Sequence, residues 1–438
     1  MKNGLSLGVA KRIITPHVGG YLYGYPNPPR STSVNDDLAV TALYLQDGDT
    51  RALLLSFTIC SLAASLCERL SVILEEETGV SRTAILLHAT HTHSGPSTTD
   101  SVGWGAADRD YIETILIPAA IAAAKEAAAS PRPARLAVSS GECLLGINRR
   151  QLVNGQSCLG QRPGGIQDTT MTVLGFFGED GAPLCTAVHY AAHCTASGKN
   201  SEITRDWAGV MIDALAEKTG APVLFLQGPE GDIGPRMPSG KTIGEASVKD
   251  ALAMGEIAAR DAVRIYNTLG DAEAVTLSTS EMTLNLPLAK RPSRAEAEAT
   301  LAKYEGFAAG VEAKTADYCR RVLASYDDGY TEKESLPIKQ NLLALGDTVL
   351  VSFPYELFSE IGINVKAKSP FTRTLSLALT GGALAYFVTE SEISYRGYEV
   401  DMFLLGNVQP YPCDADKSLT ALTLGHLDCL KTKLSNHR

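Results

Sequence analysis

The chain is poor in basic residues for its length. Its 438 residues include 39 Lys and Arg against 49 Asp and Glu, which gives a formal net charge of −10. Binding to phosphate backbones needs clustered Lys and Arg, so this balance argues against a nucleic-acid partner. No apolar run approaches the ~20 residues of a membrane span. Residues 1–8 carry one lysine and no long apolar segment, so we expect no export signal and a cytoplasmic location.

The nine cysteines are scattered along the chain and form no C-x-x-C pair. Together with the expected lack of an export signal, this distribution predicts reduced thiols rather than a disulfide framework. Cys194 directly follows a histidine, as a metal ligand or a nucleophile could. A lone cysteine more often fills space as a small apolar group, and we predict that function for Cys194.

The hydrophobic pattern indicates both strands and helices. Segments 39–45 and 52–57 flank Asp47-Gly48-Asp49, which predicts a hairpin. Strands outnumber what pure β-α-β alternation would give, so the expected class is α/β (α+β), with mixed β-sheets covered by helices. We find no internal repeat and predict one domain over residues 1–438. A polar stretch near 286–335, helical over 293–326, is the only place for a subdivision, and it would lie on the surface or bind a partner.

Three of the eight histidines lie within a single segment, Leu87-His88-Ala89-Thr90-His91-Thr92-His93-Ser94-Gly95-Pro96. The preceding residues 83–87 indicate a buried strand, and Ser94-Gly95-Pro96 indicates a turn. If the strand continues to His93, then His91 and His93 point to one face. One of them would then bind a metal ion while the other faces a substrate. The alternative is a pair of surface histidines at a strand end.

Four further segments contain residues that can bind metals or act as catalysts. They are Val188 to Thr195 with two histidines, the glycine-rich loop Gln227 to Arg236, Ser352 to Phe358 with Glu356, and Ala385 to Glu390 followed by Tyr395 to Glu399. The glycine-rich loop has neither the Walker spacing nor the dinucleotide-binding spacing.

Together and in this order, from Gly8 to Glu399, these segments resemble the neutral/alkaline, non-lysosomal ceramidase family. The most specific matches are Thr90 to Pro96, which reads THTHSGP, and the spacing of the two tyrosines. The resemblance implies a catalytic body of mixed sheets and a zinc ion bound by two histidines, a glutamate and a tyrosine. By motif match, the ligands would be His91, His193, Glu356 and Tyr386. The residues lining the substrate amide would be His93, Arg149 and Tyr398.

Several of these assignments have alternatives. His189 lies four residues before His193 and could be the ligand instead, and Arg150 could face inward in place of Arg149. Glu356 taken alone would be a solvated turn carboxylate, and Tyr386 alone would belong to a strand core. Asp232 is either a turn cap or a residue that supports the zinc ligands from behind.

The chain also departs from the family pattern. Gly234 occupies the position of a family serine once proposed as a nucleophile, which excludes a covalent serine route there but leaves a zinc-hydroxide route intact. Too few residues follow Glu399 for the family's immunoglobulin-like domain. Ceramide resides in membranes, and a cytoplasmic enzyme without such a domain is poorly placed to meet it. The resemblance therefore favours a smaller, water-soluble substrate over ceramide itself.

The sequence predicts a zinc-dependent hydrolase that cleaves the carbon–nitrogen bond of a small N-acyl or cyclic amide through a zinc-activated water. Zinc with N and O ligands and an open position lowers the pKa of its water from 15.7 to about 7. A zinc-dependent esterase, lactonase or lactamase is the first alternative, because such a nucleophile attacks any activated carbonyl. A non-catalytic ligand-binding protein is the second. The expected partner is a small-molecule substrate, and a homo-oligomer is compatible with the sequence.

Overall fold

Three mixed β-sheets form the body of the protein. The computed structural model describes residues 4–237 and 245–436. The first sheet has the order β5-β4-β3-β1-β6. Its strands are β1 (Ser6–Ile13), β3 (Ala39–Asp47), β4 (Thr50–Phe57), β5 (Ile85–Ala89) and the short β6 (Arg132–Pro133).

The second sheet has the order β14-β12-β11-β7, and the third has the order β16-β17-β18-β20. The strands of the second sheet are β7 (Arg135–Glu142), β11 (Thr170–Phe177), β12 (Pro183–Tyr190) and β14 (Val223–Gln227). Those of the third are β16 (Leu277–Pro287), β17 (Ser335–Leu345), β18 (Thr348–Ser352) and β20 (Arg373–Leu377). These sheets confirm the predicted α/β (α+β) class.

All three sheets share one topology, so the chain does contain an internal repeat of structure. In each sheet three strands run antiparallel in succession, and the fourth is parallel to the third. A helix lies between the two parallel strands in the chain, as a β-α-β crossover requires. These helices are α1 (Ala64–Thr78), α4 (Asp206–Thr219) and α8 (Ser359–Lys368). The sequence analysis missed this repeat because what recurs is strand order and not residue identity.

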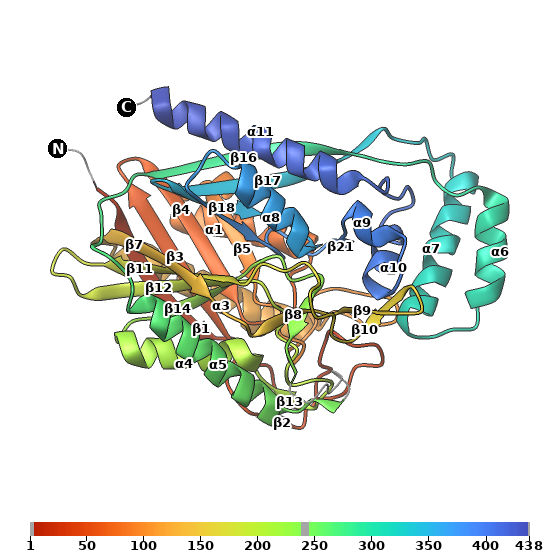
Figure 1. Ribbon diagram of the computed structural model, residues 1–438, viewed down its shortest axis with the longest axis horizontal. Helices are drawn as coiled ribbons and strands as arrows, with labels where there is room; N and C mark the ends of the chain where they lie inside the picture. Colours follow the sequence, from red (N-terminus) through yellow and green to blue (C-terminus); the bar gives the residue numbers. More distant parts are fainter. Residues whose placement is uncertain (1–3, 238–244, 437–438) are drawn as a thin grey trace.

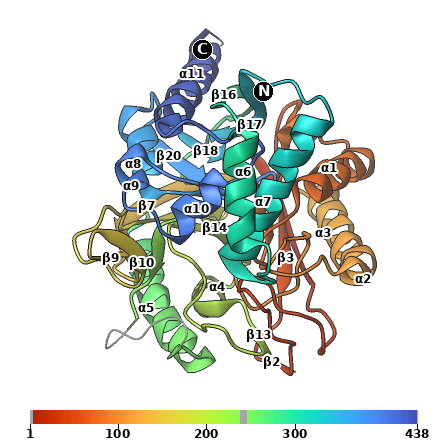
Figure 2. The ribbon, with the colours of Figure 1, turned by 90° about the vertical axis from the view of Figure 1, so that its right-hand side faces the viewer.

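Each sheet has its own layer of helices and shares its other face with a neighbouring sheet (Figures 1 and 2). Helices α1 and α3 (Ile117–Ala129) cover the first sheet, α4 and α5 (Val248–Tyr266) the second, and α8 and α11 (Ala415–Asn436) the third. The largest apolar cluster takes side chains from all three sheets. Burial of that shared cluster holds the sheets against one another.

The predicted hairpin around Asp47-Gly48-Asp49 is confirmed by the pairing of β3 with β4. The stretch predicted to be helical over 293–326 is helical but interrupted, because it forms two helices, α6 (Arg294–Tyr304) and α7 (Gly310–Asp327). The break falls just before Gly310, whose φ of 71° lies in the left-handed region that favours glycine. Both helices lie at one end of the molecule, beside α9 (Glu390–Ile393) and α10 (Tyr398–Leu404) (Figure 1). A subdivision of the chain at 286–335 stays a prediction.

Short strand pairs connect the loops that leave the three sheets. Residues of β19 (Glu356–Leu357) pair in parallel with those of β21 (Tyr386–Phe387). The other pairs join β8 (Gly146–Asn148) to β15 (Ile233–Pro235), β9 (Arg150–Val153) to β10 (Gln156–Leu159), and β2 (Ser33–Val34) to β13 (Glu202–Ile203). The remaining short helices are η1 (Arg82–Ala84), α2 (Arg109–Tyr111) and η2 (Ile112–Leu116). Among the described helices, none has the length and apolar character needed to cross a membrane.

Candidate metal centre

The parallel strand pair of each sheet supplies one residue to a common cluster. His91 follows β5 of the first sheet, His193 follows β12 of the second, and Glu356 follows β18 of the third. Ligands commonly bind beyond the carboxyl ends of parallel strands, because the loops there are free to vary. The repeated topology therefore brings together three residues that are far apart in the sequence.

The three side chains meet at hydrogen-bond distances. Oε2 of Glu356 lies 3.3 Å from Nε2 of His91 and 3.2 Å from Nε2 of His193. The potential ligand atoms of this group all lie within 4.8 Å of one another. Both histidines are buried, with His91 2% exposed and His193 fully covered. One ion could therefore contact all three side chains.

Backbone carbonyls fix which ring nitrogen faces the cluster. Nδ1 of His91 lies 2.8 Å from the carbonyl oxygen of Cys60, and Nδ1 of His193 lies 2.8 Å from that of Glu230. A carbonyl only accepts, so each Nδ1 carries a proton and each Nε2 is the ring nitrogen that is left to bind a metal ion. Metal-binding histidines are typically oriented in this way.

Two buried atoms of the cluster have no hydrogen-bond partner among the described residues. They are Nε2 of His193 and Oε2 of Glu356, which approach each other without hydrogen-bonding geometry. A buried lone pair and a buried carboxylate oxygen are costly when left unpaired. A divalent cation bound between them would satisfy both. The nitrogen and oxygen donors fit zinc and also fit iron or manganese.

The predicted continuation of the strand to His93, which would have placed His91 and His93 on one face, is wrong. Strand β5 ends at Ala89, and His91 has a φ of 71°, so alternation along a strand does not place these side chains. Such a backbone conformation is uncommon for a residue other than glycine and often marks a functional site. The two rings nevertheless meet, with 3.2 Å between their Nε2 atoms.

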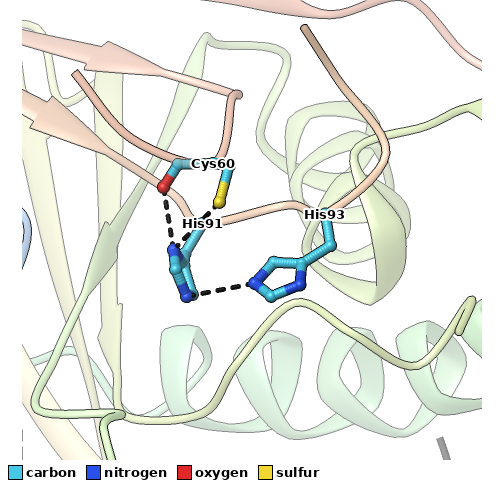
Figure 3. Close-up of side chains that lie close together, drawn as sticks. All are labelled: Cys60, His91 and His93. Carbon is cyan, nitrogen blue, oxygen red and sulfur yellow. Dashed lines mark hydrogen bonds between the residues drawn. The ribbon is translucent and has the colours of Figure 1, made fainter. Parts of the chain in front are cut away.

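Figure 3 shows the contacts that join His91 to Cys60 and to His93. The Sγ atom of Cys60 lies 3.6 Å from Nδ1 of His91, and Nε2 of His93 lies 3.2 Å from Nε2 of the same ring. Gly24 packs against the His93 ring so closely that an added Cβ would lie 2.3 Å from the ring's Cγ. Cys60, His91 and His93 thus form a second group whose potential ligand atoms lie within 4.8 Å of one another.

Arg149, and not Arg150, contacts the predicted tyrosine ligand. The Arg149 guanidinium donates to the hydroxyl of Tyr386 at 2.9 Å and to Glu399 at 2.9 Å. Arg150 donates to the other oxygen of Glu399 at 2.7 Å and to Glu392 at 2.9 Å. Glu399 thus neutralises two buried arginines at once, a function that the sequence analysis missed although the residue adjoins Tyr398.

A pocket of about 230 Å³ adjoins the cluster and is lined by His91, His93, Glu356, Tyr386 and Tyr398. Tyr386 stands opposite Glu356 in the β19–β21 pair, and its ring meets that of Tyr398 edge to face at 5.5 Å. Five of the seven predicted site residues therefore line one cavity, and His193 is buried behind it, where its Nε2 contacts Glu356. Arg149 reaches the cavity only through Tyr386.

The alternative histidine, His189, lies away from this cavity. Its Nε2 is 2.9 Å from the backbone oxygen of Ser376 and does not face the cluster. Asp232 accepts hydrogen bonds from the backbone amide of Ser359 at 2.7 Å and from the side chain of Asn148 at 3.0 Å. It ties together the loops that carry the site and does not contact the ligands' rings. Cys194 is fully buried in the core of the second sheet, as predicted.

Burial and mutual attraction set the charges within the cluster. Burial opposes the charging of His91, yet Cys60 and Glu356 raise its pKa well above the ordinary 6.5. Burial also opposes the charging of Glu356, but the two histidines hold its pKa well below 4.5. Burial, together with Arg149 and His91, lowers the pKa of His193 to about 3. The cluster thus favours an anionic carboxylate and attracts one positive charge.

Glu230 is a further carboxylate that the sequence analysis missed. It is completely buried, and neither of its carboxylate oxygens has a hydrogen-bond partner among the described residues. Burial raises its pKa well above 4.5, with His91 opposing this shift and Glu356 adding to it. Its position in a glycine-rich loop gave no signal that its side chain would be buried.

Comparison with known proteins shows the fold. No protein-family model matches the chain, and no curated protein matches it. Among solved structures, the neutral ceramidase from Pseudomonas aeruginosa is similar to this chain with a TM-score of 0.74 and 16% identity, over 98% of this chain and 75% of that one. A ceramidase complexed with C2 gives a TM-score of 0.73 and 15% identity, over 98% and 76%. The resemblance expected from the motifs is therefore confirmed at the level of the fold.

Proposed function

We propose that this protein is a metal-dependent hydrolase, with zinc as the metal, that cleaves the amide bond of a small N-acyl or cyclic amide. The observation that carries the proposal is the meeting of His91 Nε2, His193 Nε2 and Glu356 Oε2 beside a pocket that His91 and Glu356 line. The ceramidase fold of the chain is consistent with amide chemistry. A zinc ion held by these residues would polarise a substrate carbonyl and activate a water as nucleophile.

His91, His193, Glu356 and Tyr386 would hold the ion. Burial raises the pKa of Tyr386 well above 10, with Glu356 adding to the effect and Arg149 opposing it. The guanidinium of Arg149 stabilises negative charge on the phenol oxygen, because it donates directly to that atom. Arg149 is thus a positioning residue for Tyr386, and its predicted contact with substrate stays a prediction.

His93 and Tyr398 would act on the substrate itself. Burial and the two neighbouring histidines lower the pKa of His93 well below 6.5, so its ring is neutral at neutral pH and can accept a proton. Burial raises the pKa of Tyr398 above 10, so its phenol stays protonated and can donate to the oxyanion or to the leaving amine. One neutral base and one neutral donor at the pocket wall fit the two proton movements of amide hydrolysis.

The test combines metal content with hydrolysis. We expect the purified protein to hold about one zinc per chain by elemental analysis and to hydrolyse N-acyl amino acids, while His91→Ala loses both. A panel that adds lactones, esters and lactams to the amides decides which bond is cleaved. Stoichiometric zinc in His91→Ala would show that the ligand assignment is wrong. Zinc binding without turnover of any of these compounds would instead favour the alternative of a non-catalytic ligand-binding protein.

A further inference from the structure

The pocket beside the cluster contains one positively charged side chain that the proposed reaction does not use. Lys314 belongs to α7, the second helix of the polar stretch, and lines the pocket together with Trp104, Tyr398 and Met402. Its side chain is half-buried. A cation facing a small cavity attracts a ligand of opposite charge.

Lys314 has no counter-ion among the described residues. Its ammonium group forms no ion pair or hydrogen bond with any residue in 4–237 or 245–436. The acidic neighbour one turn along the helix, Asp317, is engaged by Arg321 at 3.0 Å. Burial lowers the pKa of Lys314, and the nearby Arg321 adds to the effect. An anion in the pocket would stabilise the charged ammonium against both burial and the nearby Arg321.

The other charged groups at the pocket wall have a charged partner or belong to the proposed metal cluster. Asp100 pairs with Arg109 at 2.7 Å and accepts a hydrogen bond from the backbone amide of Ala107 at 3.0 Å. Glu356 lies between the two histidines of the cluster. Arg149, the other cation near the cluster, is neutralised by Glu399. Lys314 is therefore the charged side chain that remains for a ligand among the described residues of the wall.

The position of Lys314 is set by a close backbone contact. The amide of Gly310, at the start of α7, lies 3.5 Å from the carbonyl oxygen of Gly103, and a Cβ on Gly103 would lie 2.9 Å from that amide nitrogen. The loop with Gly103 also carries Trp104, which lines the pocket. The start of α7 is thus held against the pocket rim, and Lys314 lies one turn further along the helix.

We infer that Lys314 forms an anion subsite, and that the pocket takes small amides that carry a carboxylate, such as N-acyl amino acids. This inference rests on the proposed function for the identity of the amide, but the binding of the carboxylate does not depend on turnover. The remaining wall, with Trp104, Leu379 and Met402, would receive an apolar side chain. The ammonium would bind the carboxylate while the scissile amide faces the cluster.

The test uses two ligands that differ only in the carboxylate, N-acetylphenylalanine and N-acetylphenethylamine. Their affinities are measured by calorimetry with zinc-loaded and with metal-free protein. We expect the wild type to prefer the carboxylate by ~10- to 100-fold in both forms, the range for a charge-assisted hydrogen bond. Lys314→Met should remove this preference, and Lys314→Arg should retain most of it. Lys303→Met is the matched control, because Lys303 is exposed on α6 and lines a different cavity.

The outcomes separate the two proposals. Equal affinity for both ligands in the wild type, or no binding of the carboxylate, would overturn the inference, as would a preference that persists in Lys314→Met. Hydrolysis of amides without a preference for the carboxylate would support the proposed function and reject the anion subsite. A preference that depends on Lys314, in a protein that hydrolyses none of the amides, would support the anion subsite and reject the proposed function.

Discussion

Two loops at equivalent places in the fold approach the His91 ring near different nitrogen atoms. Cys60 lies three residues after β4 in the first sheet, and His193 lies three residues after β12 in the second. The thiol of Cys60 approaches Nδ1 of His91, whereas His193 and Glu356 lie on the side of Nε2. Repetition of the topology thus offers two candidate metal groups that share one imidazole ring.

The difference between the two groups lies in the backbone. The carbonyl of Cys60 already receives the Nδ1 proton of His91 at 2.8 Å, so the lone pair of the ring points away from the thiol. Burial also raises the pKa of the Cys60 thiol, which disfavours the thiolate that a metal needs. We therefore expect an ion on the side of His193 and Glu356. Four predictions test this choice.

The largest effect is expected from His193→Ala. Loss of one buried ligand should lower zinc affinity by at least ~100-fold, since even residues behind the ligands commonly cost 10- to 100-fold. Competition with a coloured chelator measures the change. The matched control is His189→Gln, four residues earlier and also buried, which should alter affinity little because the Nε2 of His189 faces Ser376. An unchanged zinc affinity in His193→Ala would instead assign the ion to the group of Cys60, His91 and His93.

Glu356→Gln should have the next largest effect. The amide keeps the shape of the side chain but removes its negative charge, so we expect zinc affinity to fall by ~10- to 100-fold. The same competition assay applies, and the folded state is checked by circular dichroism. If the ion were bound by Cys60, His91 and His93, this substitution would leave affinity nearly unchanged.

Zinc affinity should also depend on pH. In the ion-free protein, burial opposes the charging of His91, but Cys60 and Glu356 raise its pKa well above 6.5, so below that raised pKa the ion must displace a proton. Affinity should fall as pH falls through the raised pKa, by up to about tenfold per pH unit. In Glu356→Gln the proton is held less tightly, so the dependence should move to lower pH. A pH-independent affinity would show that His91 is not displacing a proton.

The smallest effect is expected from Cys60→Ala. The thiol contributes no lone pair to the ion on the favoured side, so zinc affinity should stay within about threefold of the wild type. The backbone carbonyl that orients His91 is retained in this variant, which makes it a control for the ring's orientation. A loss comparable to that of His193→Ala would instead assign the thiol as a ligand.

Sequence motifs predicted which residues gather but not how they are oriented. His91, His193, Glu356 and Tyr386 were identified from their segments. The structure brings the first three together, and Tyr386 lines the same cavity as His91 and Glu356. The positive φ of His91 and the carbonyls behind the two imidazoles depend on loops that meet only after folding. No local pattern could have indicated them.

Long-range pairing also explains the residues that were missed. Glu399 bridges Arg149 and Arg150 across some 250 positions, and such a partner cannot be read from the neighbours of either arginine. Lys314 looked like one of many solvated charges on a polar helix. The break before Gly310 and the contact with Gly103, which set its position, became visible only in three dimensions.

The contribution of one residue from each sheet has a consequence for folding. An ion bound to His91, His193 and Glu356 would cross-link three segments that lie more than 100 positions apart in the chain. Closing such long loops is entropically costly for an unfolded chain. Because the three ligands meet only in the folded state, the free energy of metal binding would offset that cost there. Chelation should therefore lower the unfolding temperature of all three sheets together rather than loosen one loop.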